Sequence, residues 1–216
     1  MLCLGLQLGG QRADTLAAQT AQREADAHPS TDSRSSDGWP GSALHVFDGD
    51  TLQLPDGSRL RLDGIDTPET GRPFADAATE AVRELLASGR WFLHPEQPPR
   101  DVYGRLLGGL RNARGLDLGE TLLARGLAWI YREKDPRLLA LQAAAVDARR
   151  GVHSGLDALP GPFVVTAQSF HRPDCSLVRR RGRQLPWSAS AAPLLKAGRA
   201  ACRRCMRWPP RRMVAH

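Results

Sequence analysis

The chain has 216 residues, of which 41% are hydrophobic, and its formal net charge is +7. This length supports one large domain or two small ones, each with a buried core. No apolar run approaches the roughly 18 residues that a membrane-spanning helix needs, so we expect no membrane anchor.

The positive charge is concentrated at the C-terminal end. Residues 171–216 contain twelve Arg and Lys residues and one acid, Asp174, so this segment carries +11 and residues 1–170 carry −4. Nearly all basic residues are arginine, which a general coding bias also produces, but a bias does not explain the asymmetry. Anionic partners are therefore expected near the C-terminal end.

The first 40 residues are rich in Ala, Gln, Ser, Asp and Gly and show little periodicity. The opening MLCLGLQLGG has no basic residue before its apolar run and no clear cleavage site, so it is a poor signal peptide. We expect residues 1–40 to be a disordered tail or the remnant of a leader, with order beginning near Ala43.

Residues 41–158 alternate strand and helix signals. Residues 43–47 predict a strand, and residues 51–54 and 59–62 predict a hairpin around Asp56-Gly57, with leucines on one face of the second strand and arginines on the other. Helices are predicted at 73–89, 117–126 and 135–151, and strands at 90–94, 105–112 and 127–131. This order indicates an α+β domain built on a small closed barrel.

Carboxylates and arginines gather between residues 48 and 69. Phosphodiester cleavage needs a cation, an activated water and donors for the charge of the transition state. Asp50 and Asp66 offer carboxylates, the carbonyl of Thr67 offers a neutral oxygen, and Arg61 offers a planar fork of donors. A second arginine, Arg105, comes from the segment DVYGRLLG at residues 101–108. Each piece alone is more typical of a turn, but together and in this order they favour a catalytic site.

The blocks VFDGDTLQL, RLRLDGIDTPE, DVYGRLLG and LLARGLAWIY resemble the staphylococcal-nuclease-like thermonuclease family over residues 44–155. The resemblance implies a five-stranded oligonucleotide-binding-type barrel with three helices. It also implies calcium-dependent hydrolysis of DNA and RNA, leaving a 3′-phosphate and a 5′-hydroxyl.

The resemblance also assigns roles by motif. The calcium positions are Asp50, Asp66 and Thr67, with Asp48 beside the metal. The catalytic positions are Arg61 and Arg105, which bind the phosphate, and Glu69, which acts as general base or orients water. The nucleotide positions are Tyr103 and Tyr131. One departure is His153, which stands where the family has a tryptophan and which we expect to be a capping or surface residue.

A second module is predicted at residues 163–209, with a basic tail at 210–216. His171 and Cys175, then Cys202 and Cys205, form two short ligand pairs separated by 26 residues, which is typical of a structural zinc site. Three unrelated cysteines, or a disulfide between the last two, are the alternatives. A short helix is predicted within residues 188–198.

This module resembles the N-terminal metal-binding module of bacterial methylphosphotriester DNA-repair proteins. In that family the first ligand is a cysteine that accepts the methyl group. Here it is His171, so the resemblance does not extend to methyl transfer. What remains is a zinc-held basic module whose arginines either bind nucleic-acid phosphates or form a solvated surface.

The sequence therefore predicts a monomeric nuclease with calcium and zinc, acting on DNA and RNA with single strands preferred. The alternative is a non-catalytic nucleic-acid-binding or scaffold protein built on the same barrel. For the compartment, calcium and the family favour an extracellular or periplasmic location, whereas reduced thiolates and the poor leader favour the cytoplasm.

Overall fold

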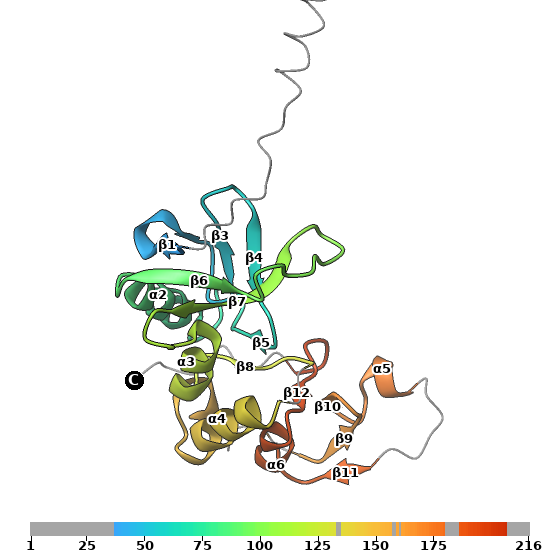
Figure 1. Ribbon diagram of the computed structural model, residues 1–216. Helices are drawn as coiled ribbons and strands as arrows, with labels where there is room; N and C mark the ends of the chain where they lie inside the picture. Colours follow the sequence, from blue (N-terminus) through green and yellow to red (C-terminus); the bar gives the residue numbers. More distant parts are fainter. Residues whose placement is uncertain (1–36, 133–134, 157–158, 160, 180–185, 207–216) are drawn as a thin grey trace, which may run out of the picture. The chain divides into compact units, whose positions relative to one another are not determined.

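The computed structural model describes residues 37–132, 135–156, 159, 161–179 and 186–206 (Figure 1). The predicted tail at residues 1–36 and the basic tail at 210–216 lie outside these ranges. Residues 37–40 were expected to belong to the tail, but Trp39–Pro40 forms strand β1 and pairs antiparallel with β6, Arg90–His94. Trp39 packs against the hydrophobic core, and this burial explains why order begins before Ala43.

The N-terminal part is built on a curled sheet with the strand order β1-β6-β7-β4-β3-β2. The remaining strands are β2 (His45–Val46), β3 (Thr51–Gln53), β4 (Arg59–Leu62) and β7 (Leu106–Asn112). Two further strands, β5 (Ile65–Asp66) and β8 (Trp129–Ile130), form a separate antiparallel pair. The predicted α+β class is confirmed, but the predicted five-stranded closed barrel is replaced by a six-stranded sheet whose edges are β1 and β2.

The hairpin and the periodic segments form as their patterns predict. β3 and β4 pair antiparallel, with Leu60 and Leu62 buried and the arginines of β4 on the other face. The three predicted helices are α2 (Ala75–Leu86), α3 (Leu118–Arg125) and α4 (Pro136–Asp147). A short 3-10 turn, η1 (Gly41–Ala43), precedes β2, and another, η2 (Gly151–His153), follows α4. The sequence pattern predicts that this helix ends at Gly151, but α4 ends earlier, at Asp147.

Local chemistry fixes the ends of α3 and α4. The side chain of Asp117 accepts the backbone N–H of Glu120 at 3.0 Å, and Gly126 ends α3 with a φ of 71°. The side chain of Asp135 accepts the backbone N–H of Arg137 at 2.7 Å, and Pro136 occupies the first turn of α4.

The C-terminal part has its own small sheet and its own hydrophobic cluster. Its strands are β9 (Phe163–Val165), β10 (Ser169–His171), β11 (Trp187–Ser188) and β12 (Ala200–Ala201), in the order β11-β9-β10-β12. Helix α5 (Ser176–Arg179) follows β10, and α6 (Ala192–Lys196) lies within the segment predicted as a short helix. The cluster centres on Phe163 and Phe170, whose rings meet edge to face.

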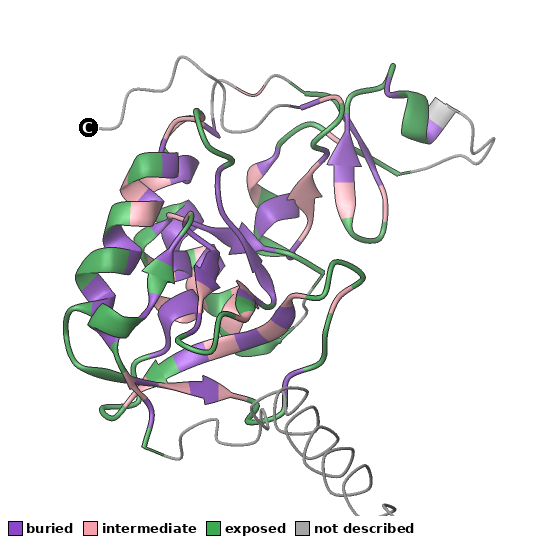
Figure 2. Ribbon diagram, turned by 90° about the horizontal axis from the view of Figure 1, so that it is seen from above, coloured by how far each residue is buried: buried purple, intermediate pink, exposed green. Residues whose placement is uncertain are grey.

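Gln142 of α4 connects the two parts of the chain. Its side chain is buried, its amide oxygen accepts the backbone N–H of Ile130 at 2.7 Å, and its amide nitrogen donates to the carbonyl of Leu195 in α6. Val146, also on α4, belongs to the C-terminal hydrophobic cluster. One helix thus packs against β8 and against the C-terminal part. Figure 2 shows how buried and exposed residues are distributed over the fold.

His153 is buried, whereas the sequence predicted a capping or surface residue. Its ring is fully excluded from solvent, and neither ring nitrogen has a hydrogen-bond partner among the described residues. Burial lowers the pKa of His153 to about 4, so the ring is neutral at neutral pH.

None of the helices described in the structure is long and apolar enough to cross a membrane.

We predict that His153 makes the protein acid-sensitive. The pKa is about 4 when folded and 6.5 when unfolded, so the unfolded state binds the extra proton and stability falls as the pH drops below 6.5. Between pH 7.5 and pH 5, this group should lower the free energy of unfolding by about 2 kcal/mol.

Urea unfolding of the wild type and of His153→Leu at both pH values measures this effect, and the variant should lose about 2 kcal/mol less than the wild type. His45→Leu is the matched control, because the His45 side chain is exposed. Equal pH slopes for the wild type and His153→Leu would contradict the prediction.

Candidate active site and metal cluster

One pocket gathers every residue that the sequence predicted for catalysis, calcium or nucleotide contacts. It has a cavity volume of about 320 Å³ and draws on separate chain segments. Its lining residues are Asp48, Asp50, Thr51, Arg61, Asp66, Thr67, Pro68, Glu69, Tyr103, Arg105, Tyr131 and Arg203. The predicted residues therefore share one cavity. They come from separate segments, which the pairing of β4 with β7 and of β5 with β8 brings together.

Arg61 lies between the two carboxylates at the centre of the pocket. Its Nε is 3.3 Å from Oδ1 of Asp50, and one terminal nitrogen is 2.7 Å from Oδ1 of Asp66. The other terminal nitrogen donates to the carbonyl of Leu62 at 2.8 Å. Thr51 is the cross-strand partner of Arg61, so the β3–β4 hairpin fixes the backbone position from which the Arg61 side chain extends.

Asp50 is held by a second set of donors. Its Oδ2 accepts the backbone N–H of Thr67 at 2.8 Å and the Thr67 hydroxyl at 2.9 Å. Asp48 does not contact this carboxylate. Instead, its Oδ1 accepts the backbone N–H groups of Asp50 and Thr51 and shapes the turn before β3.

Burial makes both central carboxylates poor anions. It raises the pKa of Asp50 to about 6, against the attraction of Arg61, and it also raises the pKa of Asp66. A bound cation would offset this unfavourable burial. Because the donors are carboxylate oxygens with the backbone of Thr67 beside them, the site fits a hard cation such as calcium.

Glu69 and Arg105 lie at the more open part of the pocket. The Glu69 side chain is 71% exposed, so it can meet water. The Arg105 side chain is held by the carboxylate of Asp101, with Nε and one terminal nitrogen both 2.8 Å from Oδ2. Asp101 also accepts the backbone N–H groups of Tyr103 and Arg105, so it orders the whole loop.

Two tyrosines expose their rings at the same pocket. Tyr103 is 82% exposed, and the Arg105 guanidinium lies 5.6 Å from the centre of its ring. Tyr131 follows β8 and is 37% exposed. Exposed aromatic rings beside a polar cavity are suited to stacking on bases.

Sequence reasoning missed the part played by Asp101, and it named Arg203 only as one of several phosphate-binding candidates of the C-terminal module, not as a residue of this pocket. Asp101 has a weak signal, since it lies four residues before Arg105 in the same turn. Arg203 has no local signal in the sequence that places it in this pocket. It pairs with Oδ2 of Asp66, and a second guanidinium nitrogen is 3.2 Å from Oε1 of Glu69.

A second cluster brings together the four predicted metal ligands. The ligand atoms of His171, Cys175, Cys202 and Cys205 all lie within 4.8 Å of one another. The parallel pairing of β10 with β12 produces this, because Phe170 lies opposite Ala201, His171 is the last residue of β10 and Cys202 directly follows β12. The described cysteines are free thiols, so the alternative of a Cys202–Cys205 disulfide is not what the structure contains.

The cluster fits a tetrahedral metal ion. Ligands bound about 2.3 Å from a tetrahedral centre lie about 3.8 Å apart, which is within the 4.8 Å limit that encloses the ligand atoms of this cluster. The hydroxyl of Ser169 is 2.9 Å from Nε2 of His171, which orients the ring so that a metal would be bound through Nδ1. Burial and the neighbouring thiols raise the pKa of Cys205 to about 12, and a cation would reverse that shift.

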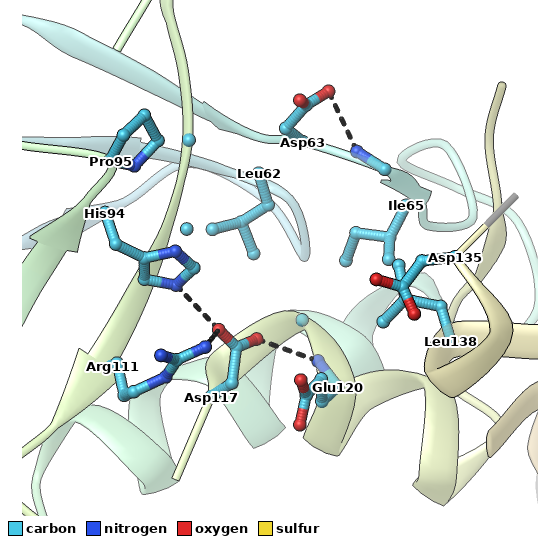
Figure 3. Close-up of a pocket in the computed structure, with 14 residues that line it drawn as sticks. Leu62, Asp63, Ile65, His94, Pro95, Arg111, Asp117, Glu120, Asp135 and Leu138 are labelled. Atoms are coloured by element: carbon cyan, nitrogen blue, oxygen red, sulfur yellow. Dashed lines mark hydrogen bonds and ion pairs between the residues drawn. The ribbon is translucent and has the colours of Figure 1, made fainter. Parts of the chain in front are cut away.

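A further cavity, shown in Figure 3, does not share the residues of the proposed active site. His94 Nε2 lies 2.7 Å from Oδ2 of Asp117, and Arg111 lies 3.6 Å from the same oxygen (Figure 3). Since the other oxygen of Asp117 caps α3, these residues explain how one helix begins. They take no part in the chemistry proposed below.

The sequence profile described as "Staphylococcal nuclease homologue" matches residues 59–154. An "Uncharacterized endonuclease" of Escherichia coli O157:H7 is 33% identical over 134 residues, which cover 56% of this chain and 86% of that protein. The chain belongs to the staphylococcal nuclease homologue family.

Other relatives agree with this family assignment. A "Thermonuclease" of Staphylococcus intermedius is 39% identical over 71 residues, covering 29% of this chain and 42% of that protein. A "Micrococcal nuclease" of Shigella flexneri is 30% identical over 103 residues, covering 43% of this chain and 58% of that protein. These matches support nuclease activity at the level of the family. The profile match ends before His171, so the metal cluster rests on its own geometry.

We predict that Asp50→Asn stabilises the metal-free protein at alkaline pH. The folded pKa of Asp50, about 6, lies above the unfolded value of 3.8, so ionisation destabilises the fold as the pH rises from 3.8 through 6. In EDTA at pH 8, the variant should gain roughly 1–3 kcal/mol in the free energy of unfolding, and little at pH 4. A variant that is less stable than the wild type by the same amount at both pH values would refute this.

Proposed function

We propose that the chain is a calcium-dependent nuclease that hydrolyses the phosphodiester bonds of DNA and RNA to 3′-phosphate and 5′-hydroxyl ends. One observation carries the proposal. The buried carboxylates of Asp50 and Asp66, the exposed carboxylate of Glu69 and the guanidinium groups of Arg61 and Arg105 all line a single pocket. Membership of the family supports the same reaction class.

The two arginines bind the scissile phosphate in this proposal. Arg61 is already ordered by Asp50 and Asp66, and Arg105 is ordered by Asp101, so neither guanidinium loses much freedom when a phosphate arrives. Both are planar forks that match phosphate oxygens, and their charge stabilises the extra negative charge of the transition state.

Glu69 activates the water in this proposal. Its exposed carboxylate can accept a proton from a water molecule beside the phosphate, or hold that water in line for attack. Calcium, when bound by Asp50, Asp66 and the carbonyl of Thr67, would supply charge neutralisation of the phosphate. Asp48 supports that site through the turn that positions Asp50.

The substrate class follows from what lines the pocket. Arginines recognise the phosphate, which DNA and RNA share, and the exposed rings of Tyr103 and Tyr131 can stack on any base. Stacking requires unpaired bases, so we propose a preference for single strands.

We also propose that residues 163–209 form a zinc-held module next to a nuclease domain at residues 41–158. Three sulfur ligands and one imidazole complete a tetrahedral shell and leave no open position, so the zinc is structural. The first ligand is His171, and an imidazole cannot accept a methyl group as a thiolate does. The module therefore supports the nuclease rather than alkylation repair.

The nuclease proposal predicts large losses of rate from single substitutions. Glu69→Gln and Arg105→Gln should each lower kcat on single-stranded DNA by about a hundredfold or more, because each removes a group that acts in the transition state. Cleavage by the wild type should stop in a chelator and return with calcium. The measurement is release of acid-soluble nucleotides under saturating substrate.

Glu96→Gln is the matched control, because Glu96 is exposed and does not line the pocket. Wild-type protein that binds DNA in a salt-dependent way but shows no turnover with calcium would instead identify a non-catalytic nucleic-acid-binding protein.

The zinc proposal predicts that the purified protein contains one zinc ion per chain, measured as the metal content by elemental mass spectrometry. Cys202→Ser should lower that content well below one, and Ser169→Ala should weaken zinc binding by about 10–100-fold, because it removes the partner that orients His171. Cys3→Ser is the control, since the four ligands are already supplied by the cluster. A full complement of zinc in Cys202→Ser would rule out the assignment.

A further inference from the structure

Arg203 lies between two ligands of the metal cluster and reaches into the proposed active site. It follows Cys202 and precedes Cys205 by two residues. Its guanidinium pairs with Asp66 and lies 3.2 Å from Oε1 of Glu69. Among the described residues that line the pocket, Arg203 alone comes from the C-terminal part of the chain.

The metal-binding loop fixes the direction in which Arg203 points. The backbone N–H of Cys202 donates to the carbonyl of Phe170 at 3.0 Å, and that of Met206 donates to the carbonyl of Cys202 at 2.8 Å. The thiol sulfur of Cys205 also accepts the backbone N–H of Arg172 at 3.3 Å. With both cysteines on one metal ion, the turn between them has little freedom.

The side chain of Arg203 remains accessible from the pocket. It is 56% exposed, although the carboxylate of Asp66 that it contacts is only 2% exposed. Its guanidinium also lies 5.9 Å from the centre of the Tyr131 ring, one of the proposed base-stacking surfaces. Arg203 therefore lies between the buried acids and the place proposed for the nucleotide.

We propose that Arg203 is a third phosphate-binding arginine and that zinc binding in the C-terminal part holds it in place. This inference rests on the proposed nuclease function and adds a substrate-binding residue to it. Zinc occupancy thereby controls the affinity for nucleic acid, although zinc lies outside the reaction.

The charges of the pocket explain how one arginine serves two states. Arg203 pairs with the carboxylates of Asp66 and Glu69 and so neutralises part of their charge. When the charge of Asp66 is neutralised by a bound cation, the attraction that holds Arg203 on that carboxylate weakens. The guanidinium is then available to a phosphate in the same pocket.

The first test measures binding without cleavage. The probe is a fluorescein-labelled single-stranded phosphorothioate oligonucleotide, titrated in calcium with the zinc-loaded full chain. Arg203→Gln should raise the Kd about tenfold, the effect of losing one charge-assisted contact to phosphate. Arg204→Gln is the matched control: it removes the same charge from the same loop but does not line the pocket, and it should change the Kd less than twofold.

The second test uses an effect of opposite sign. Without nucleic acid, Arg203 competes with a cation for Asp66, so Arg203→Gln should bind calcium several-fold more tightly by calorimetry. Cys202→Ser should reproduce the weaker oligonucleotide binding, and combining it with Arg203→Gln should add little to either change. Thermal unfolding confirms that each variant is folded.

The outcomes separate the inference from the nuclease proposal. Wild type that fails to cleave DNA with calcium overturns the nuclease proposal, and the binding arm still tests Arg203. Unchanged oligonucleotide affinity in Arg203→Gln overturns the inference. Faster cleavage by Arg203→Gln overturns it as well, because that result identifies Arg203 as an inhibitory plug.

Discussion

The proposed active site depends on two buried carboxylates that share one guanidinium group. Asp50 and Asp66 are almost fully excluded from solvent, and Arg61 contacts both. Burial is the main reason why the pKa values of both carboxyl groups are raised, in spite of the positive charge of Arg61 beside them. The fold therefore retains an arrangement that weakens the free protein and favours a cation.

The same reasoning explains why the C-terminal part matters to the pocket. The charge of Arg61 does not fully balance the acids, since Glu69 adds a further negative charge. Arg203 supplies another positive charge, although it lies 137 residues after Asp66 in the chain. In our proposal, a zinc ion bound by the neighbouring cysteines would hold this loop in place, since the C-terminal part has only a small hydrophobic cluster. Metal binding in one part of the chain would then be linked to the charge balance of the pocket.

Much of this could be predicted from local sequence patterns. The hairpin of β3 and β4 and the helices α2, α3 and α4 follow from alternation, apolar periodicity and capping residues. The pocket residues were found because the charged motifs are distinctive. The pairing of β1 with β6, the open edges of the sheet, the burial of His153 and the entry of Arg203 were missed. Each of these depends on contacts between distant segments, which no local pattern records.

Gln142 has a consequence for dissecting the protein into fragments. Its amide oxygen accepts the backbone N–H of Ile130 in β8, and its amide nitrogen donates to the carbonyl of Leu195 in α6, which also accepts the backbone N–H of Gly198. A truncated chain that ends before Phe163 would leave this amide and the neighbouring apolar surface of α4 facing solvent. Val146 would lose its hydrophobic surroundings in the same step. Such a fragment would therefore lack an internal support for β8, and Tyr131 directly follows that strand. Its properties would reflect this loss as well as the loss of the C-terminal part itself.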